Sequence, residues 1–380
     1  MQETTYKICS RCVMDTSAQE VHFDANGYCN FCEALITKIQ NGSSAKNKSD
    51  ALDDLMNKVK RHGRKKNYDC IIGVSGGIDS SWVLVQAVKH GLRPLAVHMD
   101  NGWNSELATN NISSLLGALN VDLFTYVIEW EEYRRLMESF FDADVIDIEL
   151  LYDNAMTEVC YMKAREFGLK YILSGSNTAT EGMQMPKCWA YEDKWDGTNI
   201  VAIASKNNAT ISSFPLFTNA KWLYSRYIKG IQWVPFLDYQ EYDKNAATET
   251  LQREYGFKPY PYKHYENVFT RFYQSFILPT KFGVDKRRVH LSSLIISNQL
   301  TRDEAISVLQ TPAFISAEQL RLDTDYFLRK MGWEKTKLDA YLSRTRKEHS
   351  EFKTDMLRKW LFPILRISAT VTRRVTRSLR

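Results

Sequence analysis

The stretch YDCIIGVSGGIDSS, residues 68–81, decides the fold. Its first seven residues form a short apolar run typical of a buried strand, and a helical pattern runs from Trp82 to Gly91. Gly76 and Gly77 lie between the two and permit a tight turn whose N–H groups face inward beside the positive N-terminus of the helix. The serine hydroxyls of the same turn add donors, so the sequence predicts a cradle for phosphate or pyrophosphate.

This turn lacks a Walker lysine, since no part of the chain reads GxxxxGK[ST]. A glycine turn that binds no ligand is one alternative to a nucleotide site. An α/β hydrolase is another, because residues 73–77 also satisfy its GxSxG nucleophile elbow. That fold builds several strands before its nucleophile strand, whereas only a cysteine-rich segment and a polar linker precede the motif here.

Residues 75–80, Ser-Gly-Gly-Ile-Asp-Ser, resemble the SGGxDS signature of PP-loop ATP pyrophosphatases. Those enzymes cleave ATP between its α and β phosphates and pass AMP to a substrate oxygen. The resemblance implies that ATP is bound by the residues of this loop: Ser75, Gly76, Gly77, Asp79, Ser80 and Ser81. Asp79 is also expected to hold Mg²⁺ against the polyphosphate, because a carboxylate beside the loop can bind the ion that neutralises the departing charge.

Strands and helices alternate after the loop. Strands are expected at 93–100, 123–128 and 171–173, and helices at 106–119, 131–142 and 153–167. This alternation predicts a doubly wound parallel sheet with a ligand crevice at the carboxyl ends of its strands. In PP-loop enzymes these ends border adenosine and the phosphates, so the resemblance makes Asp100 and Ser176 candidate ATP contacts. His98 fits a buried strand histidine as well as a ligand contact.

Four of the seven cysteines form two pairs, Cys9-x-x-Cys12 and Cys29-x-x-Cys32. Two such turns can supply the four thiolates of a closed structural zinc site, and Asn26-Gly27 suits the turn of a small hairpin, as in a zinc ribbon. Two disulfides are the alternative, which a reducing compartment disfavours. A site with four thiolates leaves no position for a catalytic water, so we expect a structural Zn²⁺.

Length and composition predict a protein of several domains. The 380 residues are 44% hydrophobic and 25% charged, without an N-terminal apolar signal core or an uncharged apolar run long enough to cross a bilayer. We therefore expect a cytoplasmic protein. The expected domains are a zinc-ribbon module at 1–40, a linker with a short helix at 41–66, the PP-loop domain at 67–215, a helical substrate-binding region at 216–345 and a basic tail at 346–380.

Positive charge gathers near the carboxyl end. Residues 281–380 hold 21 Lys or Arg against 11 Asp or Glu, and the last 24 residues hold seven basic side chains and no acidic one. Such a tail is suited to a membrane surface, nucleic acid or an acidic partner, and a solvated helix end is the alternative.

A cationic segment, KFGVDKRRVHLSS at 281–293, is the second candidate site. Its Lys281, Lys286 and Arg287 are expected to grip phosphate during pyrophosphate departure, and Arg288 to bind a nucleotide-linked sugar. A surface charge run or a docking face for a partner are the alternatives. Upstream, ionisable groups alternate with aromatic ones in a mixture that suits sugar binding, although aromatic packing in a helical core would look similar; the candidates are Lys263, His264, Glu266 and Arg271.

The cysteine pairs, SGGIDSS, SGSNTATEGM, KHYENVFTRFYQ and KFGVDKRRVHLSSLI together resemble the N-acetyl sugar amidotransferase family of WbpG/PseA-like proteins, over residues 6–345. The resemblance implies an α/β fold of the PP-loop (adenine nucleotide alpha hydrolase-like) type, with an N-terminal zinc ribbon and a largely helical C-terminal region. It further implies conversion of a sugar acetamido group to an acetamidino group with ATP and ammonia, in bacterial surface polysaccharide synthesis.

The resemblance also implies the partners. The substrate is an N-acetylated, nucleotide-linked sugar, and separate glutaminase and cyclase-like proteins, resembling the subunits of imidazole glycerol phosphate synthase, supply ammonia. No glutaminase nucleophile is evident, because none of Cys70, Cys160 and Cys188 lies in a nucleophile elbow. A nucleic-acid partner is not expected. A tRNA thiolase, in which free cysteines carry sulfur, and a non-catalytic scaffold are the alternatives.

Overall fold

The computed structural model of the protein describes residues 6–43, 48–260 and 265–357, and its centre is a five-stranded parallel sheet. The strand order is β3-β2-β1-β4-β5. The strands are β1 (Cys70–Gly73), β2 (Pro94–Asp100), β3 (Leu123–Val127), β4 (Tyr171–Ser174) and β5 (Gln232–Pro235). The predicted doubly wound parallel sheet is confirmed. The fifth strand was not predicted, because a four-residue run ending in proline carries little pattern.

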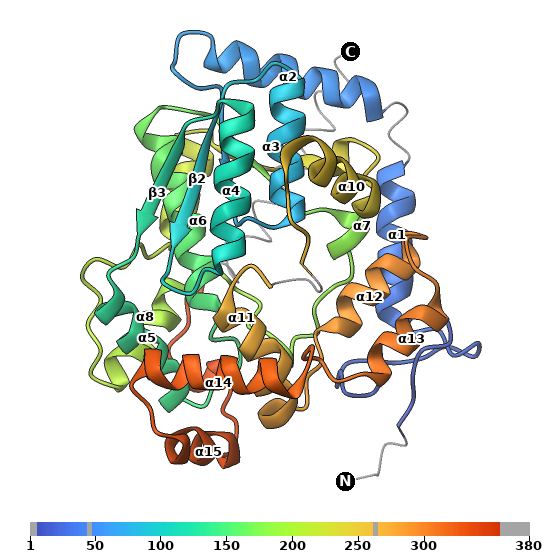
Figure 1. Ribbon diagram of the computed structural model, residues 1–380, viewed down its shortest axis with the longest axis vertical. Helices are drawn as coiled ribbons and strands as arrows, with labels where there is room; N and C mark the ends of the chain where they lie inside the picture. The colour runs from blue at the N-terminus through green and yellow to red at the C-terminus, as the bar shows by residue number, and fades with distance from the viewer. Residues whose placement is uncertain (1–5, 44–47, 261–264, 358–380) are drawn as a thin grey trace.

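Helices cover both faces of the sheet (Figure 1). Alternate strand residues point to opposite faces, so Ile71 and Val97 join one buried cluster, whereas Ile72 and Ala96 join another. The helices around the sheet are α2 (Lys48–Gly63), α3 (Ile78–Lys89), α4 (Glu106–Leu119), α5 (Trp130–Asp142), α6 (Leu150–Glu166), α8 (Gly197–Lys206) and α10 (Lys244–Tyr255).

Local signals explain where several helices begin and end. Ser105 caps α4 by accepting a hydrogen bond from the N–H of Ala108, and Asn120 ends it in the left-handed conformation. The helix thus begins and ends where the sequence predicted it, at residues 106 and 119. The expected linker at 41–66 is more helical than predicted, since α1 (Asn30–Ser43) extends into it and α2 spans most of it.

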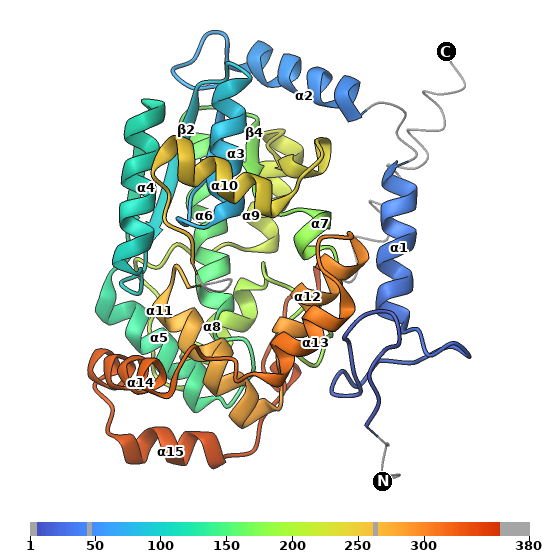
Figure 2. The ribbon, with the colours of Figure 1, turned by 45° about the vertical axis from the view of Figure 1, so that its right-hand side comes forward.

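The carboxyl-terminal part is largely helical, as expected, and continues the core on the α6 side of the sheet. Figure 2 shows α12 and α13 beside α1 and the amino-terminal segment, with α14 and α15 at the far end of the molecule. These elements are α11 (Val268–Phe272), a π-helical segment η3 (Tyr273–Phe282), α12 (Arg287–Ile296), α13 (Arg302–Gln310), α14 (Ala317–Met331) and α15 (Lys335–Ser343).

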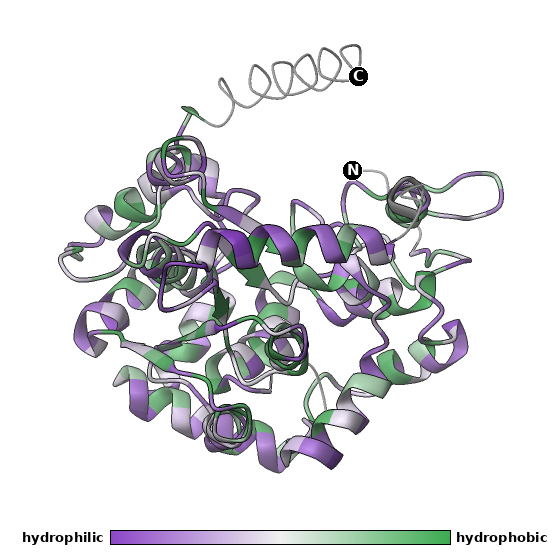
Figure 3. Cartoon of the chain, turned by 90° about the horizontal axis from the view of Figure 1, so that it is seen from above, coloured by the Kyte–Doolittle hydropathy of each residue, from purple (hydrophilic) through white to green (hydrophobic). Residues whose placement is uncertain are grey.

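Most helices carry hydrophilic and hydrophobic residues on different sides, as the view from above shows (Figure 3). In the described part of the chain no helix combines the length and the hydrophobicity that a membrane span needs.

Candidate active site

A cavity of about 570 Å³ lies at the carboxyl ends of β1 and β4. These two strands are neighbours at the centre of the sheet, where the strand order reverses. Ligands of open α/β sheets bind at such a switch point. Residues of the loop after β1 and of α3 form one wall, and residues 266–294 contribute to the opposite wall.

The loop after β1 is held in shape by hydrogen bonds among its own residues. The Ser75 hydroxyl accepts a hydrogen bond from the N–H of Gly77 (3.2 Å) and lies 3.2 Å from the Ser80 hydroxyl. Gly76 has a φ of +82°, and a Cβ there would come within 2.8 Å of the Ala108 carbonyl oxygen. Only glycine fits this position without strain. Gly77 lines the cavity, where its backbone is open to a ligand.

The loop after β4 completes this wall. A Cβ on Gly175 would lie 2.9 Å from the backbone of both Asp79 and Ser80, so the two loops touch only because residue 175 is glycine. Ser176 lines the cavity, and its hydroxyl lies 2.7 Å from that of Ser174. The structure thus brings Ser176 next to the SGGIDSS loop, as predicted.

Two tyrosines that sequence reasoning missed hold this loop. The Tyr242 hydroxyl donates a hydrogen bond to Asp79 (2.5 Å), and burial, together with the Asp79 charge, raises the pKa of Tyr242. The Tyr260 hydroxyl donates to the Gly76 carbonyl (3.0 Å). Both tyrosines lie far along the chain from the motif, in a segment without a recognisable pattern, so no sequence signal pointed to them.

The opposite wall includes Glu266 and Arg271, as the sugar-site prediction requires. Glu266 is placed by its backbone, whose carbonyl accepts a hydrogen bond from the Ser105 N–H after β2 (2.9 Å). The Arg271 guanidinium forms a two-pronged ion pair with Asp323. The predicted site residues Lys263 and His264 lie outside the described residues.

A buried ion pair lies in the far wall. The Lys286 ammonium is 2.6 Å from a Glu149 oxygen, and the Gln274 amide donates to the same carboxylate (2.9 Å). Lys286 and Gln274 line the cavity. Glu149 and Gln274 were not predicted; Glu149 is one of several acids before α6, and nothing in the sequence distinguishes it.

The other predicted cations do not converge on the cavity. Lys281 is turned away: its buried ammonium contacts Asp144 (3.0 Å) and the carbonyls of Tyr341 and Arg344, and burial lowers the pKa of Lys281. It does not line the cavity, so a grip on phosphate there is wrong for Lys281. Arg287 does line it, but its guanidinium is paired with Asp285 (2.8 Å).

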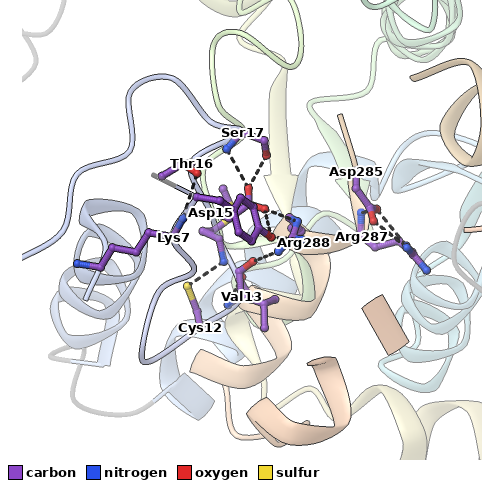
Figure 4. Close-up of polar contacts among 12 residues, drawn as sticks. Lys7, Cys12, Val13, Asp15, Thr16, Ser17, Asp285, Arg287 and Arg288 are labelled. Carbon is purple, nitrogen blue, oxygen red and sulfur yellow. Dashed lines mark hydrogen bonds and ion pairs between the residues drawn. The ribbon is translucent and has the colours of Figure 1, made fainter. Parts of the chain in front are cut away.

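Arg288 faces the amino-terminal segment instead (Figure 4). Its guanidinium contacts Asp15 (3.0 Å) and the Val13 carbonyl (2.8 Å), whereas Arg287 turns toward Asp285. A sugar contact by Arg288 is therefore wrong in this structure. The physical reason is helical spacing, which sends neighbours in α12 about 100° apart.

Two predicted ATP contacts lie elsewhere. Asp100 belongs to a second cavity, beside His98 and Asn104, and accepts hydrogen bonds from Gly102 and Asn104. His98 bonds the Val74 carbonyl (2.8 Å) before the SGGIDSS loop, which fits a structural strand histidine. Ser81 is buried beneath the loop and does not line the main cavity.

The four paired cysteines converge. Their ligand atoms lie within 4.8 Å of one another, with Sγ–Sγ distances of 3.9 Å for Cys9–Cys32 and 3.6 Å for Cys12–Cys29. A disulfide would need about 2.05 Å. Four sulfurs at about 2.3 Å from one tetrahedral ion lie about 3.8 Å apart, so the set fits a single metal ion.

The remaining thiols are not placed for chemistry. Cys70 and Cys160 are wholly buried, and burial raises the pKa of Cys160 to about 12. Cys188 is half-buried and bonds Glu20 (3.3 Å). Among the described residues that line the main cavity none is a cysteine.

The parallel sheet, its order and the SGGIDSS loop at the switch point define a PP-loop protein. Residues 266–366 match the family model described as "LPS biosynthesis protein WbpG-like, C-terminal domain". This part of the chain is similar to that family, and it forms much of the wall opposite the loop.

Several known proteins are similar to parts of the chain. A glutamine-hydrolyzing GMP synthase from Pyrobaculum aerophilum is 30% identical over 126 residues, which are 33% of this chain and 24% of that protein. The chain thus matches about a quarter of the length of that relative. The structure of NMN synthetase from Francisella tularensis is 15% identical and covers 57% of this chain and 98% of its own, with a TM-score of 0.29. The structure of the U34-tRNA thiolase NcsA from Methanococcus maripaludis, with its [4Fe-4S] cluster, is 12% identical. It covers 81% of this chain and 89% of its own, with a TM-score of 0.33.

Proposed function

We propose that the protein is an ATP-dependent PP-loop enzyme that converts a sugar acetamido group to an acetamidino group. The observation that carries the proposal is a cavity lined by both the SGGIDSS loop and the WbpG-like segment. Its volume suits a nucleotide and the reacting part of a second substrate.

The chemistry needs two steps, because the oxygen of an amide is a poor leaving group. In the first, the acetamido oxygen attacks the α-phosphorus of ATP, the bond to the β-phosphate breaks and pyrophosphate leaves. In the second, ammonia adds to the imidate carbon, AMP leaves with the former amide oxygen, and the nitrogen loses a proton. The first step needs the attacking oxygen and the departing pyrophosphate in line at phosphorus, and the second needs ammonia to approach one face of the imidate carbon, so the cavity must orient both reactants.

The residues divide between two tasks. The hydroxyls of Ser75 and Ser80 and the amino-terminal end of α3 line the cavity and are suited to bind the departing pyrophosphate. Asp79, fixed by Tyr242, would bind Mg²⁺, which neutralises phosphate charge when bound. Arg271 and Glu266 line the opposite side and would bind the sugar substrate, and Lys286 beside them would grip phosphate.

The test combines the purified full chain, ATP, Mg²⁺, ammonium and a panel of nucleotide-linked N-acetylated sugars. We expect pyrophosphate release that depends on one of these sugars and a product whose mass is that of the acetamidine. Asp79→Asn should abolish both signals, whereas Asp303→Asn, exposed on α13, should not. Pyrophosphate release without sugar modification would contradict the proposed substrate.

Two observations weigh against the two rival activities. A thiolase whose free cysteines carry sulfur would have one of them near the bound nucleotide, and none of the described cavity residues is a cysteine. A hydrolase requires a histidine at its serine, whereas the partners of the Ser75 hydroxyl in the described structure are Ser80 and Gly77.

We also propose that ammonia comes from separate glutaminase and cyclase-like proteins. A metal ion held by the four cysteines, which we take to be Zn²⁺, would be structural, because all four positions are occupied by sulfur.

A further inference from the structure

The end of the molecule opposite the cavity is basic. Three segments that precede β1, β4 and β5 meet there, at the amino ends of these parallel strands, with α2 along the top of Figure 1. Lysine side chains join these segments: the Lys66 ammonium donates to the Gly168 carbonyl, and the Lys170 ammonium donates to the Lys229 carbonyl. We call this surface the basic end, and its cations are Arg61, Arg64, Lys65, Lys66, Lys170, Arg226 and Lys229.

The cations of the basic end are not neutralised. In the described parts of the chain none of them forms an ion pair with a carboxylate, and Lys66 and Lys170 instead bond carbonyl groups. Burial and the nearby Lys170 charge lower the pKa of Lys66. From Gly197 to Leu237 the sequence contains no Asp or Glu. Acids near this end are already engaged, Glu166 by Lys163 and Asp122 by Tyr68. The unpaired like charges fit an anionic ligand.

Apolar side chains project beside these cations. Ile228 is 72% exposed, Tyr227 54% and Tyr224 45%, all on the π-helical turn η1 (Tyr224–Ile228) that precedes β5. The Lys229 ammonium lies over the Tyr224 ring, 5.4 Å from its centre. Exposed aromatic and aliphatic residues interleaved with Lys and Arg are typical of surfaces that lie in a membrane interface.

We propose that the basic end docks on an anionic membrane surface, with the η1 tip inserted among the lipid headgroups. The lysines and arginines would contact lipid phosphates, and Ile228 and Tyr227 would enter the boundary of the acyl chains. An RNA would use the cations but would leave the aliphatic Ile228 tip exposed to water. Because the cavity lies at the other end of the strands, it would stay open to the solvent. This inference does not depend on the proposed reaction.

The test is co-sedimentation of the full chain with vesicles at about 0.15 M salt. We expect binding to vesicles of phosphatidylglycerol and phosphatidylcholine, and little to vesicles of phosphatidylcholine alone. The double variant Arg226→Glu/Lys229→Glu should weaken binding about tenfold or more, because each cation near such a surface contributes substantially. The matched control Arg329→Glu/Lys335→Glu makes the same change in net charge on exposed residues of α14 and α15 and should bind like the wild type.

A second variant tests the apolar tip. Ile228→Ser/Tyr227→Ser alters exposed side chains only, so folding should be unchanged in a thermal melt, and vesicle binding should fall severalfold. Binding that is equal for all variants, or lost equally in the control pair, would overturn the proposal. So would selective binding of tRNA or of a poly-glutamate peptide with no retention by anionic vesicles.

Discussion

Lys286 and Glu149 form an ion pair whose side chains are only 9% and 10% exposed. Removing one partner of such a pair leaves an uncompensated buried charge, whereas removing both costs much less. The pair lies in the cavity wall, where Gln274 shares the same carboxylate. Such a pair lowers the stability of the fold, but it fixes the positions and charges of the side chains in the cavity wall.

We predict that Lys286→Met lowers the free energy of unfolding by about 3–5 kcal/mol, measured by urea denaturation. The double variant Lys286→Met/Glu149→Gln should regain most of that loss but not the ATP-dependent turnover. A double variant as unstable as the single one would show that the charge of Glu149 is not what destabilises Lys286→Met.

Lys281 provides the comparison. It is as buried as Lys286, but its partner Asp144 also has Arg344 within 3.0 Å, and it does not line the cavity. Lys281→Met should therefore lose stability while its turnover per folded molecule stays near that of the wild type. A selective loss of turnover in Lys281→Met would restore this residue to the site.

At the scale of elements, the shape of the site depends on the contact between the loop after β1 and the loop after β4. We predict that Gly175→Ala weakens ATP binding at least tenfold, because the new Cβ would lie 2.9 Å from the backbone at Asp79 and Ser80. Gly117→Ala is the matched control: no atom lies within 4 Å of its Cβ, and it lies within α4. This control should stabilise the protein by about 0.5–1 kcal/mol and leave ATP binding unchanged, as nucleotide titration and thermal unfolding can check. Tight ATP binding by Gly175→Ala would mean that the loops can separate.

Helix α12 joins the cavity to the cysteine centre. Its Lys286 cap, Arg287 and His290 line the cavity, while Arg288 and Ser292 bond the segment around Val13. Arg302, at the start of α13, donates to the carbonyls of Cys9 and Cys12. The metal-binding segment thus supports the wall of the active site from behind.

We predict that purified protein contains about one equivalent of zinc per chain, and that a chelator lowers the melting temperature by several degrees. Arg288→Ala should make zinc loss faster, whereas Arg287→Ala, one residue away on the cavity side, should not. Folded protein without metal and with unchanged stability would contradict a structural centre.

How much the sequence could predict follows from these elements. The SGGIDSS loop, the helix at 106–119 and the four cysteines have short-range signals, because each depends on neighbouring residues. The three consecutive cations at 286–288 are also easy to recognise in the sequence. The role of each cation depends on what its side of α12 packs against, and no local pattern encodes that packing. Tyr242, Glu149 and Gln274 reach the cavity only through the tertiary fold.

At the scale of the whole molecule, the proposed reaction would bring ATP, a sugar and ammonia to one cavity. The described structure offers no thiol for glutamine hydrolysis in that cavity, since Cys70 and Cys160 are buried in the core and Cys188 bonds Glu20. For the proposed reaction we therefore expect ammonia to be supplied by a separate protein.

We predict that the protein alone works with high ammonium but not with glutamine, and that the two partner proteins restore the use of glutamine. The ammonium-driven rate at fixed total ammonium should rise with pH, because only unprotonated ammonia carries the lone pair that attacks the imidate carbon. Glutamine-driven turnover with the partners should depend less on pH, since ammonia released beside the cavity reacts before it is protonated.

Lys286→Met should depress both reactions, because this residue lies inside the cavity, whereas a substitution that affects only partner docking should depress the glutamine-driven reaction alone. The measurement is acetamidine formation under each nitrogen source. Turnover of glutamine by this chain without partners would overturn the requirement for them.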